Sequence, residues 1–162
     1  MNHIKALLIG LGNIGCSYDL DVPFKNNIIE SSSQILTHAR ALSCHPCFQL
    51  VAGIDSSETA RKRFTNVYHV PSYPSLLEWK NSNFDGSRNV DLVILAVPPL
   101  LQFPLLEELL AFISPRLILL EKPVAFSSIS AEKILNLSLK LQIYWTLSAL
   151  VFNYVIFILR NQ

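Results

Sequence analysis

The sequence predicts an α/β fold, a doubly wound and mostly parallel sheet with helices on both faces. The prediction depends on three observations: four apolar runs typical of strands buried on both faces, helical segments between these runs, and short connections. Apolar residues make up 51% of the 162 residues and charged residues 15%, which excludes a disordered chain. One domain of ordinary size is expected, and a second full domain does not fit this length.

The predicted strands are residues 4–10, 49–55, 90–97 and 116–121. The predicted helices are residues 32–42, 57–64, 75–80 and 104–113. Ser56 or Ser57 is expected to cap the second helix, and Pro104 suits the first turn of the fourth. Residues 127–142 begin like a capped helix and then alternate leucine with polar residues; between helix and strand, we favour helix. This alternation of strands and helices is typical of right-handed βαβ units.

A G-x-G-x-x-G motif, Gly10-Leu11-Gly12-Asn13-Ile14-Gly15, closes the first predicted strand. In a Rossmann-type sheet, Gly10 permits the tight turn, Gly12 lets the backbone approach a pyrophosphate, and Gly15 lets the next helix pack closely. Backbone N–H groups and the helix dipole would bind the phosphates. The alternative is a glycine-rich turn that holds no ligand.

Asp55 ends the second predicted strand, where a carboxylate would accept hydrogen bonds from both ribose hydroxyls and repel a 2′-phosphate. This position favours NAD as cofactor and leaves NADP open. The alternative is that Asp55 only caps the helix that begins near Ser57. Arg61 and Arg63 are interpreted as cations on the helix surface.

The motif and the acid are unusually far apart, because Gly15 and Asp55 are separated by 40 residues, where about 20 is usual. Residues 16–31 are therefore interpreted as an inserted, solvated loop, which includes Tyr18 and Asp19. We expect the hydroxyls of residues 31–33, all serines, to cap the displaced helix.

Glu121-Lys122-Pro123 follows the fourth predicted strand, at the ligand-binding edge of the sheet. Lys122 would donate to a substrate hydroxyl or to the nicotinamide ribose, and the neighbouring Glu121 would fix its orientation. The alternative is an ordinary turn.

The segment Cys44-His45-Pro46-Cys47 contains a single C-x-x-C. Zinc needs four ligands, so His38 would have to complete the set. We therefore expect no metal site here, interpret the segment as a turn, and interpret His38 as a packed or surface histidine.

Five motifs, in order and spacing, resemble the N-terminal domain of the Gfo/Idh/MocA oxidoreductases over residues 3 to about 142. They are the glycine motif, the stretch from His38-Ala39-Arg40-Ala41 to His45-Pro46, residues 49–55, Ala96-Val97-Pro98-Pro99, and Glu121-Lys122-Pro123. The resemblance implies a nicotinamide cofactor with its pyrophosphate at Gly10, Gly12, Asn13, Ile14 and Gly15, its adenosine ribose at Asp55, and Ala96, Val97 and Pro98 beside it.

The same resemblance implies that Glu121, Lys122 and Pro123 lie near the nicotinamide and the substrate, with Lys122 as the catalytic residue. The bond before Pro123 is often cis in this family. The implied reaction is hydride exchange with a carbinol of a sugar or cyclitol, the small-molecule substrate if the chain is active. Family members continue into a substrate domain that carries a histidine, whereas no histidine follows His69 here.

Residues 1–142 are thus expected to form the dinucleotide-binding domain, and residues 143–162 an apolar tail that is a remnant of the start of a second domain. Residues 143–159 carry no charge, which suits a buried strand, a surface covered by a homo-oligomer or partner subunit, or a membrane anchor. Besides the oxidoreductase, two functions therefore stay open: a non-catalytic NAD-binding remnant or subunit, and a membrane-anchored Rossmann domain.

Charge and cysteine content exclude other classes. Lys and Arg number 13 against 12 for Asp and Glu, with no block of like charge, so nucleic acid is not an expected partner. The apolar run near the N-terminus is too short for a secretory signal, which favours the cytoplasm. Three cysteines give no disulfide framework.

Overall fold

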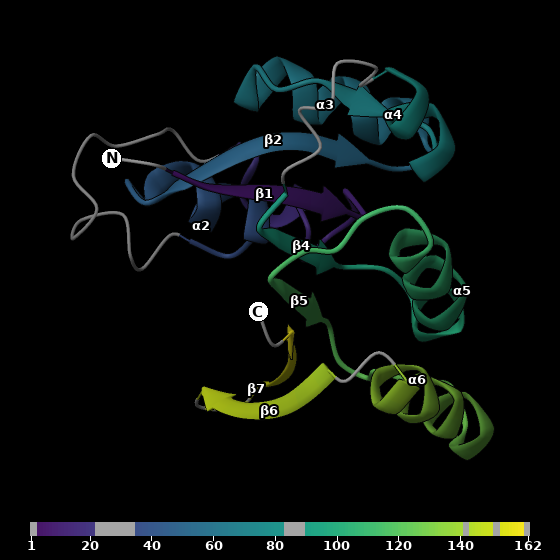
Figure 1. Ribbon diagram of the computed structural model, residues 1–162. Helices are drawn as coiled ribbons and strands as arrows, with labels where there is room; N and C mark the ends of the chain where they lie inside the picture. The colour runs from purple at the N-terminus through teal and green to yellow at the C-terminus, as the bar shows by residue number, and fades with distance from the viewer. Residues whose placement is uncertain (1–2, 22–34, 83–89, 141–142, 151–152, 161–162) are drawn as a thin grey trace.

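A computed structural model describes residues 3–21, 35–82, 90–140, 143–150 and 153–160. Within these residues the strands form one sheet in the order β3-β2-β1-β4-β5-β7-β6. Five strands run parallel to one another: β1 (Ile4–Ile9), β2 (Phe48–Ile54), β3 (Ser72–Tyr73), β4 (Leu92–Leu95) and β5 (Leu117–Leu120). The chain winds outwards from β1 to β3 and then crosses back to β4, which confirms the doubly wound α/β class (Figure 1).

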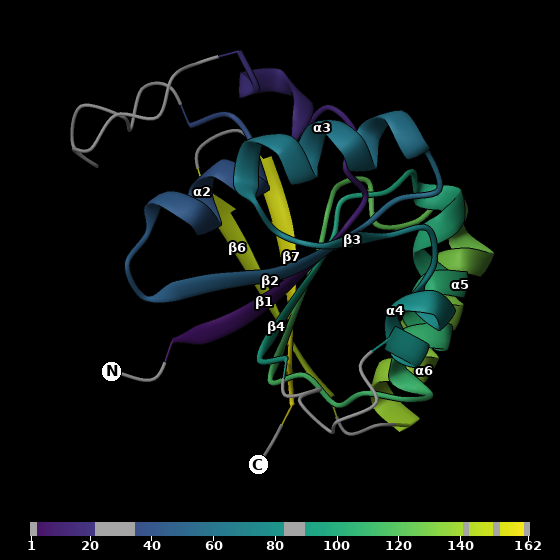
Figure 2. The same cartoon turned by 90° about the horizontal axis from the view of Figure 1, so that it is seen from above.

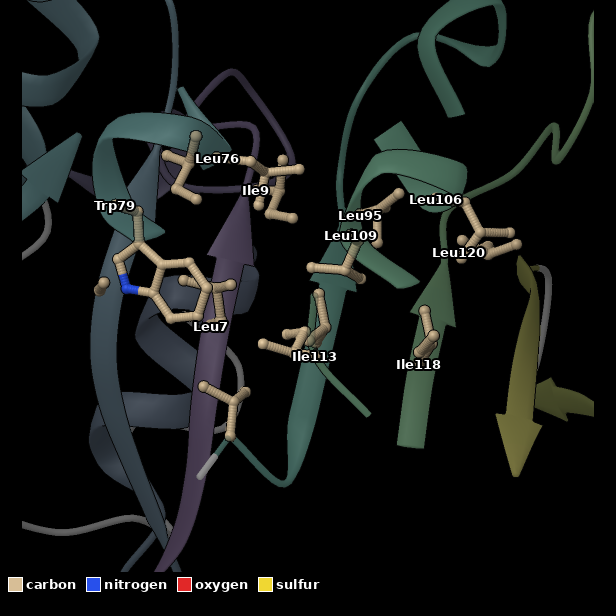
Figure 3. Close-up of a cluster of buried hydrophobic side chains, with 14 of the residues drawn as sticks. Leu7, Ile9, Leu76, Trp79, Leu95, Leu106, Leu109, Ile113, Ile118 and Leu120 are labelled. Carbon is tan, nitrogen blue, oxygen red and sulfur yellow. The ribbon is translucent and has the colours of Figure 1, made fainter. Parts of the chain in front are cut away.

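Helices cover both faces of the sheet, as Figure 2 shows. One face carries α2 (His38–Cys44) and α3 (Glu58–Tyr68); the other carries α4 (Leu76–Ser82), α5 (Pro99–Leu110) and α6 (Ser128–Lys140). Side chains of β1 alternate between the two layers: Leu7 and Ile9 join the core under α4, α5 and α6 (Figure 3), and Ala6 and Leu8 join the core under α2 and α3. Full burial of a side chain such as Leu7 contributes about 1.5–3 kcal/mol. Burial on both faces explains why the strands read as continuous apolar runs.

The four predicted strands are confirmed, with ends that differ by a few residues. The two-residue strand β3 was not predicted, because it is too short to leave a periodic pattern. The cap of α3 is Ser57, whose hydroxyl accepts a hydrogen bond from the amide of Ala60 at 3.3 Å. The preferred helix over residues 127–142 is confirmed by α6.

The predicted start of the fourth helix was wrong. The helix α5 begins at Pro99, and Pro104 lies inside it. Proline lacks an amide hydrogen and is tolerated at the first helical position, so the pair Pro98-Pro99 already satisfies the start of a helix. The amide of Leu101 donates to the carbonyl of Pro98 at 2.9 Å and closes the first turn.

The apolar tail forms two strands, β6 (Ile143–Leu150) and β7 (Asn153–Arg160). They pair antiparallel with each other, and β7 pairs antiparallel with β5. The expected strand that begins at Ile143 is β6, which forms the edge of the sheet, and β7 lies between it and β5. Residues 143–160 therefore contribute two strands rather than one continuous element. No helix in the described part of the chain is long and apolar enough to cross a membrane.

Candidate functional site

The three motif glycines lie in the turn after β1 and have different structural requirements. Gly10 has a φ of 94°, and a Cβ there would overlap the carbonyl group of Ala96. A Cβ on Gly15 would overlap the backbone carbonyl of Gly10. A Cβ on Gly12 would meet nothing within 4 Å. Backbone conformation and packing therefore explain why positions 10 and 15 require glycine. Nothing in the surrounding protein requires glycine at position 12.

The backbone after Gly10 forms one helical turn, in which the amides of Cys16 and Ser17 donate to the carbonyl of Gly12 at 2.8 and 3.0 Å. The amides of residues 12–15 have no acceptor among the described residues. Free amides of this kind are expected at the start of a helix, where no preceding turn supplies carbonyl groups. They are the donors that an anionic ligand above Gly12 would need.

The helix α2 continues this turn after an interruption. The amide of His38 donates to the carbonyl of Ile14 at 3.1 Å, and that of Ala39 donates to the carbonyl of Gly15 at 2.9 Å. In an uninterrupted helix these carbonyls would accept from residues four positions later, 18 and 19. His38 thus takes the place of residue 18, and the difference, 38 − 18 = 20 residues, accounts for the long spacing between Gly15 and Asp55.

The predicted cap of the displaced helix was wrong. Thr37 is the cap, and its hydroxyl accepts from the amide of Arg40 at 3.3 Å. Residues 31–33 lie outside the described part of the chain, as does most of the expected loop over residues 16–31. The hydroxyl of Thr37 also donates to the Asp19 carboxylate, at 2.7 Å.

Asp19 is fully buried rather than solvated. Its Oδ2 accepts from the amides of Leu36 and Thr37 at 2.9 and 3.1 Å, and lies 3.4 Å from Nε of the buried Arg40. Arg40 also donates to the backbone carbonyl of Asp19. These contacts fix the two described ends of the insertion against each other, while Tyr18 stays exposed.

Asp55 follows β2 and connects the glycine turn to α3. Its Oδ2 accepts from the amide of Leu11 and its Oδ1 from the amide of Ser57, both at 2.8 Å. The carboxylate thus supports the start of α3, as the alternative interpretation required, and each oxygen keeps a further lone pair for a ligand. Arg61 is less free than predicted, because its Nη1 donates to the carbonyls of Asp55 and Ser56 at 2.7 and 2.9 Å.

A cavity of about 500 Å³ lies at the carboxyl ends of β1, β2 and β4, on both sides of the point where the winding direction reverses. It is lined by Ile9, Gly10, Gly12, Ile54, Asp55, Ser56, Pro74, Ser75, Leu76, Ala96, Val97, Pro98, Leu101, Pro104, Leu105 and Glu108. The lining includes six predicted site residues: Gly10, Gly12, Asp55, Ala96, Val97 and Pro98. Of the others, Asn13 and Ile14 are exposed on the turn, Gly15 is buried beneath it, and Glu121, Lys122 and Pro123 follow β5 outside the lining.

The bond between Lys122 and Pro123 is cis, as the resemblance implies. Glu121 contacts the backbone of its neighbour, and the described ion pairs do not include one between its carboxylate and the Lys122 ammonium. Its Oε1 lies 2.6 Å from Nε2 of His38, and its Oε2 accepts from the backbone amide of Lys122 at 3.2 Å. The hydrogen bond with His38 lowers the pKa of Glu121 below its ordinary value of 4.5. His38 is thus a packed histidine, as one of the two interpretations expected, and its partner is the Glu121 carboxylate.

Gln102, in the first turns of α5, was missed in the sequence. Its side chain is fully buried, and Nε2 donates to the carbonyls of Glu121 and Pro123 at 2.6 and 3.2 Å. The only sequence feature that marks Gln102 is that its polar side chain stands among the apolar residues at the start of α5. The sequence offered no indication of the contact across the sheet.

Two further candidate regions are the C-x-x-C segment and a second depression. Cys44 and Cys47 carry free thiols, and within the described ranges no group of three or more His, Cys, Asp or Glu could hold a metal ion. A depression of about 610 Å³ is lined by Val90, Asp91, residues 110–114 and Arg116, where β4 and β5 begin. It lies at the opposite edge of the sheet from the glycine turn.

Comparison with known proteins identifies a family with this type of fold. A family model described as "Oxidoreductase family, NAD-binding Rossmann fold" (Gfo/Idh/MocA) matches residues 33–145. No curated protein matches the chain.

Similar solved structures include the WlbA dehydrogenase from Bordetella pertussis in complex with NADH and UDP-GlcNAcA (18% identity, TM-score 0.59, 83% of this chain and 31% of that one). A second is KijD10, a 3-ketoreductase from Actinomadura kijaniata in complex with NADP and TDP-benzene (19%, 0.59, 86% and 35%). A third is myo-inositol 2-dehydrogenase from Lactobacillus plantarum (16%, 0.58, 86% and 34%). The chain therefore spans about a third of the length of these structures.

Proposed function

Because this chain belongs to the Gfo/Idh/MocA oxidoreductase family, whose fold is an NAD-binding Rossmann fold, we propose that it binds NAD in the cavity beside the glycine turn. The observation that carries the proposal is the open space at Gly12, a glycine that neither positive φ nor packing requires. A pyrophosphate there would explain it, because a bare backbone admits the ligand and the amides of residues 12–15 supply donors.

The remaining lining suits the rest of the cofactor. The Asp55 carboxylate supplies acceptors for ribose hydroxyls, and the walls formed by Pro74, Leu101 and Leu105 suit the flat, weakly polar adenine ring. The protein groups therefore fit the chemistry of the pyrophosphate, the ribose hydroxyls and the adenine. When bound, NAD supplies the hydride acceptor, and this chain supplies binding and orientation.

We further propose a preference for NAD over NADP. A 2′-phosphate would approach the anionic Asp55, and the nearby guanidinium of Arg61 already donates to two backbone carbonyls of the same turn. Neutralising the phosphate would require Arg61 to give up these bonds.

For the whole enzyme we propose oxidation or reduction at a carbinol of a sugar or cyclitol, with the Lys122 ammonium donating to the substrate oxygen. Support comes from the exposed position of Lys122 beyond β5, on the same edge as the cavity. Two similar structures are a dehydrogenase with a nucleotide sugar and a myo-inositol dehydrogenase. Binding of the cofactor does not depend on this second proposal.

Titration of the purified protein with NADH, followed by fluorescence, tests the proposal. We expect saturable binding, with NADPH at least tenfold weaker. Asp55→Asn should weaken NADH binding, because the new amide nitrogen cannot accept from a hydroxyl.

Asp91→Asn is the matched control, since its Oδ2 accepts from the amide of Lys5 at 2.9 Å, far from the cavity. Both variants lose a carboxylate bonded to a backbone amide, and the control should keep the affinity of the wild type. If the wild-type protein gives no saturable signal with either nucleotide, the proposal is wrong.

A further inference from the structure

The carboxylate of Glu121 is next in sequence to an ammonium group, yet both of its oxygens are used elsewhere. Oε1 contacts Nε2 of His38 at 2.6 Å, and Oε2 accepts from the backbone amide of Lys122 at 3.2 Å. The His38 and Glu121 side chains are only 18% and 11% exposed. Water therefore competes weakly for this pair, and the carboxylate is fixed by one side chain and one amide.

The backbone on both sides of Lys122 is held as well. Gln102 donates from Nε2 to the carbonyls of Glu121 and Pro123. Both acceptors are carbonyl oxygens, which assigns the orientation of the amide, because the opposite orientation would place oxygen against oxygen. The residue between the two anchored carbonyls is Lys122, whose side chain is exposed.

The ammonium of Lys122 forms no ion pair with any residue that the structure describes. The ion pairs there join His38 to Glu121, Arg40 to Asp19, and Lys62 to Glu58. The carboxylate closest to Lys122 in sequence is thus occupied by a histidine from a helix 83 residues away in the chain.

We propose that His38 is a positioning residue for Lys122: by binding the Glu121 carboxylate, it prevents that carboxylate from pairing with the adjacent ammonium. The ammonium then stays available to a ligand at the carboxyl edge of the sheet, which rests on the function proposed above. His38 also begins α2, whose amides continue the glycine turn. One residue thus connects the turn assigned to the pyrophosphate with the turn that carries the lysine.

Competitive acylation of lysine amines with trace acetic anhydride, read by peptide mass spectrometry, tests this inference without substrate or cofactor. An ion pair keeps the proton on an amine and slows its acylation. In His38→Leu the Glu121 carboxylate is released, and we expect Lys122 to react at least threefold more slowly than in the wild type. Lys62, which pairs with Glu58 at 2.6 Å, is the internal reference and should not change.

The double variant His38→Leu/Glu121→Gln separates positioning from general damage. A neutral amide cannot form an ion pair, so the acylation rate of Lys122 should return to the wild-type value. An unchanged rate in His38→Leu, or a slower rate that the double variant does not restore, would overturn the inference.

Adding saturating NADH to the wild type in a second arm reports on the proposed function separately. Protection of Lys122 by NADH would support its place beside the cofactor. Absence of NADH binding would count against the function, and the ratios measured without nucleotide would still decide the role of His38.

Discussion

Replacing Gly12 by alanine should separate cofactor binding from folding. The new Cβ would meet no protein atom within 4 Å, and the backbone at Gly12 is not in the left-handed region. Loss of a glycine restricts the unfolded chain, so the free energy of unfolding should stay constant or rise by about 0.4–1 kcal/mol. The methyl group would nevertheless occupy the space assigned to the pyrophosphate. We expect NADH affinity to fall at least tenfold, about 1.4 kcal/mol.

Gly15→Ala is the contrasting variant in the same turn. Its Cβ would overlap the backbone carbonyl of Gly10, a group that cannot rotate away. Overpacking of this kind costs about 1–3 kcal/mol. Urea denaturation should therefore show a destabilised Gly15→Ala protein and a Gly12→Ala protein at least as stable as the wild type.

Fluorescence titration with NADH completes the comparison. The reasoning fails if Gly12→Ala binds NADH as tightly as the wild type, because the open space would then have no role in binding. It also fails if Gly12→Ala is destabilised as much as Gly15→Ala, because Gly12 would then have a structural role.

Three further variants test the structure around the site. Asp19→Ala should lower the free energy of unfolding by about 3–5 kcal/mol, because it leaves the buried Arg40 without this carboxylate; a loss below about 1 kcal/mol in urea denaturation would contradict the buried pair. His69→Gly should raise the free energy of unfolding by about 0.5–1 kcal/mol, since His69 ends α3 with a φ of 54°, which glycine adopts more readily. An unchanged or lower melting temperature would argue against backbone strain at His69. The His38 hydrogen bond lowers the pKa of Glu121. The ionised Glu121 therefore contributes fully to the free energy of unfolding above its ordinary pKa, and this contribution disappears as pH falls through the lowered pKa of the folded state. Melting temperatures from about pH 3 to pH 6 should therefore show the wild type losing its advantage over Glu121→Gln as the solution becomes more acidic, whereas a constant difference would contradict the shift.

Local patterns were sufficient to predict four of the five parallel strands, all except the two-residue β3. Continuous apolar runs mark strands buried on both faces, and a glycine motif at the end of the first run marks the ligand edge. The predicted start of α5 was wrong because two prolines could each occupy the first turn of the helix. The structure uses the earlier one, Pro99, and Pro104 lies inside the helix. The excess spacing between Gly15 and Asp55 predicted an insertion, but a local pattern does not show which residues close it.

Contacts between distant residues explain the rest. The pairing of His38 with Glu121 joins residues 83 positions apart, and nothing in either local segment encodes the partner. Gln102 holds the carbonyls around Lys122 from a different helix. The place of β7 beside β5 likewise depends on strand pairing that apolar content does not specify.

The interruption between the glycine turn and α2 makes this position a suitable acceptor for a foreign protein domain. The helical hydrogen bonds that the carbonyls of Ile14 and Gly15 would accept from residues 18 and 19 are made instead by His38 and Ala39. Entry and exit are held together by the 2.7 Å contact between Asp19 and Thr37, the short end-to-end separation that a grafted module with adjacent termini requires. Doubling the length of such a segment adds only about 0.6 kcal/mol of closure entropy. A fluorescent reporter grafted there would stand next to the glycine turn, and we expect it to leave the underlying sheet and helices in place.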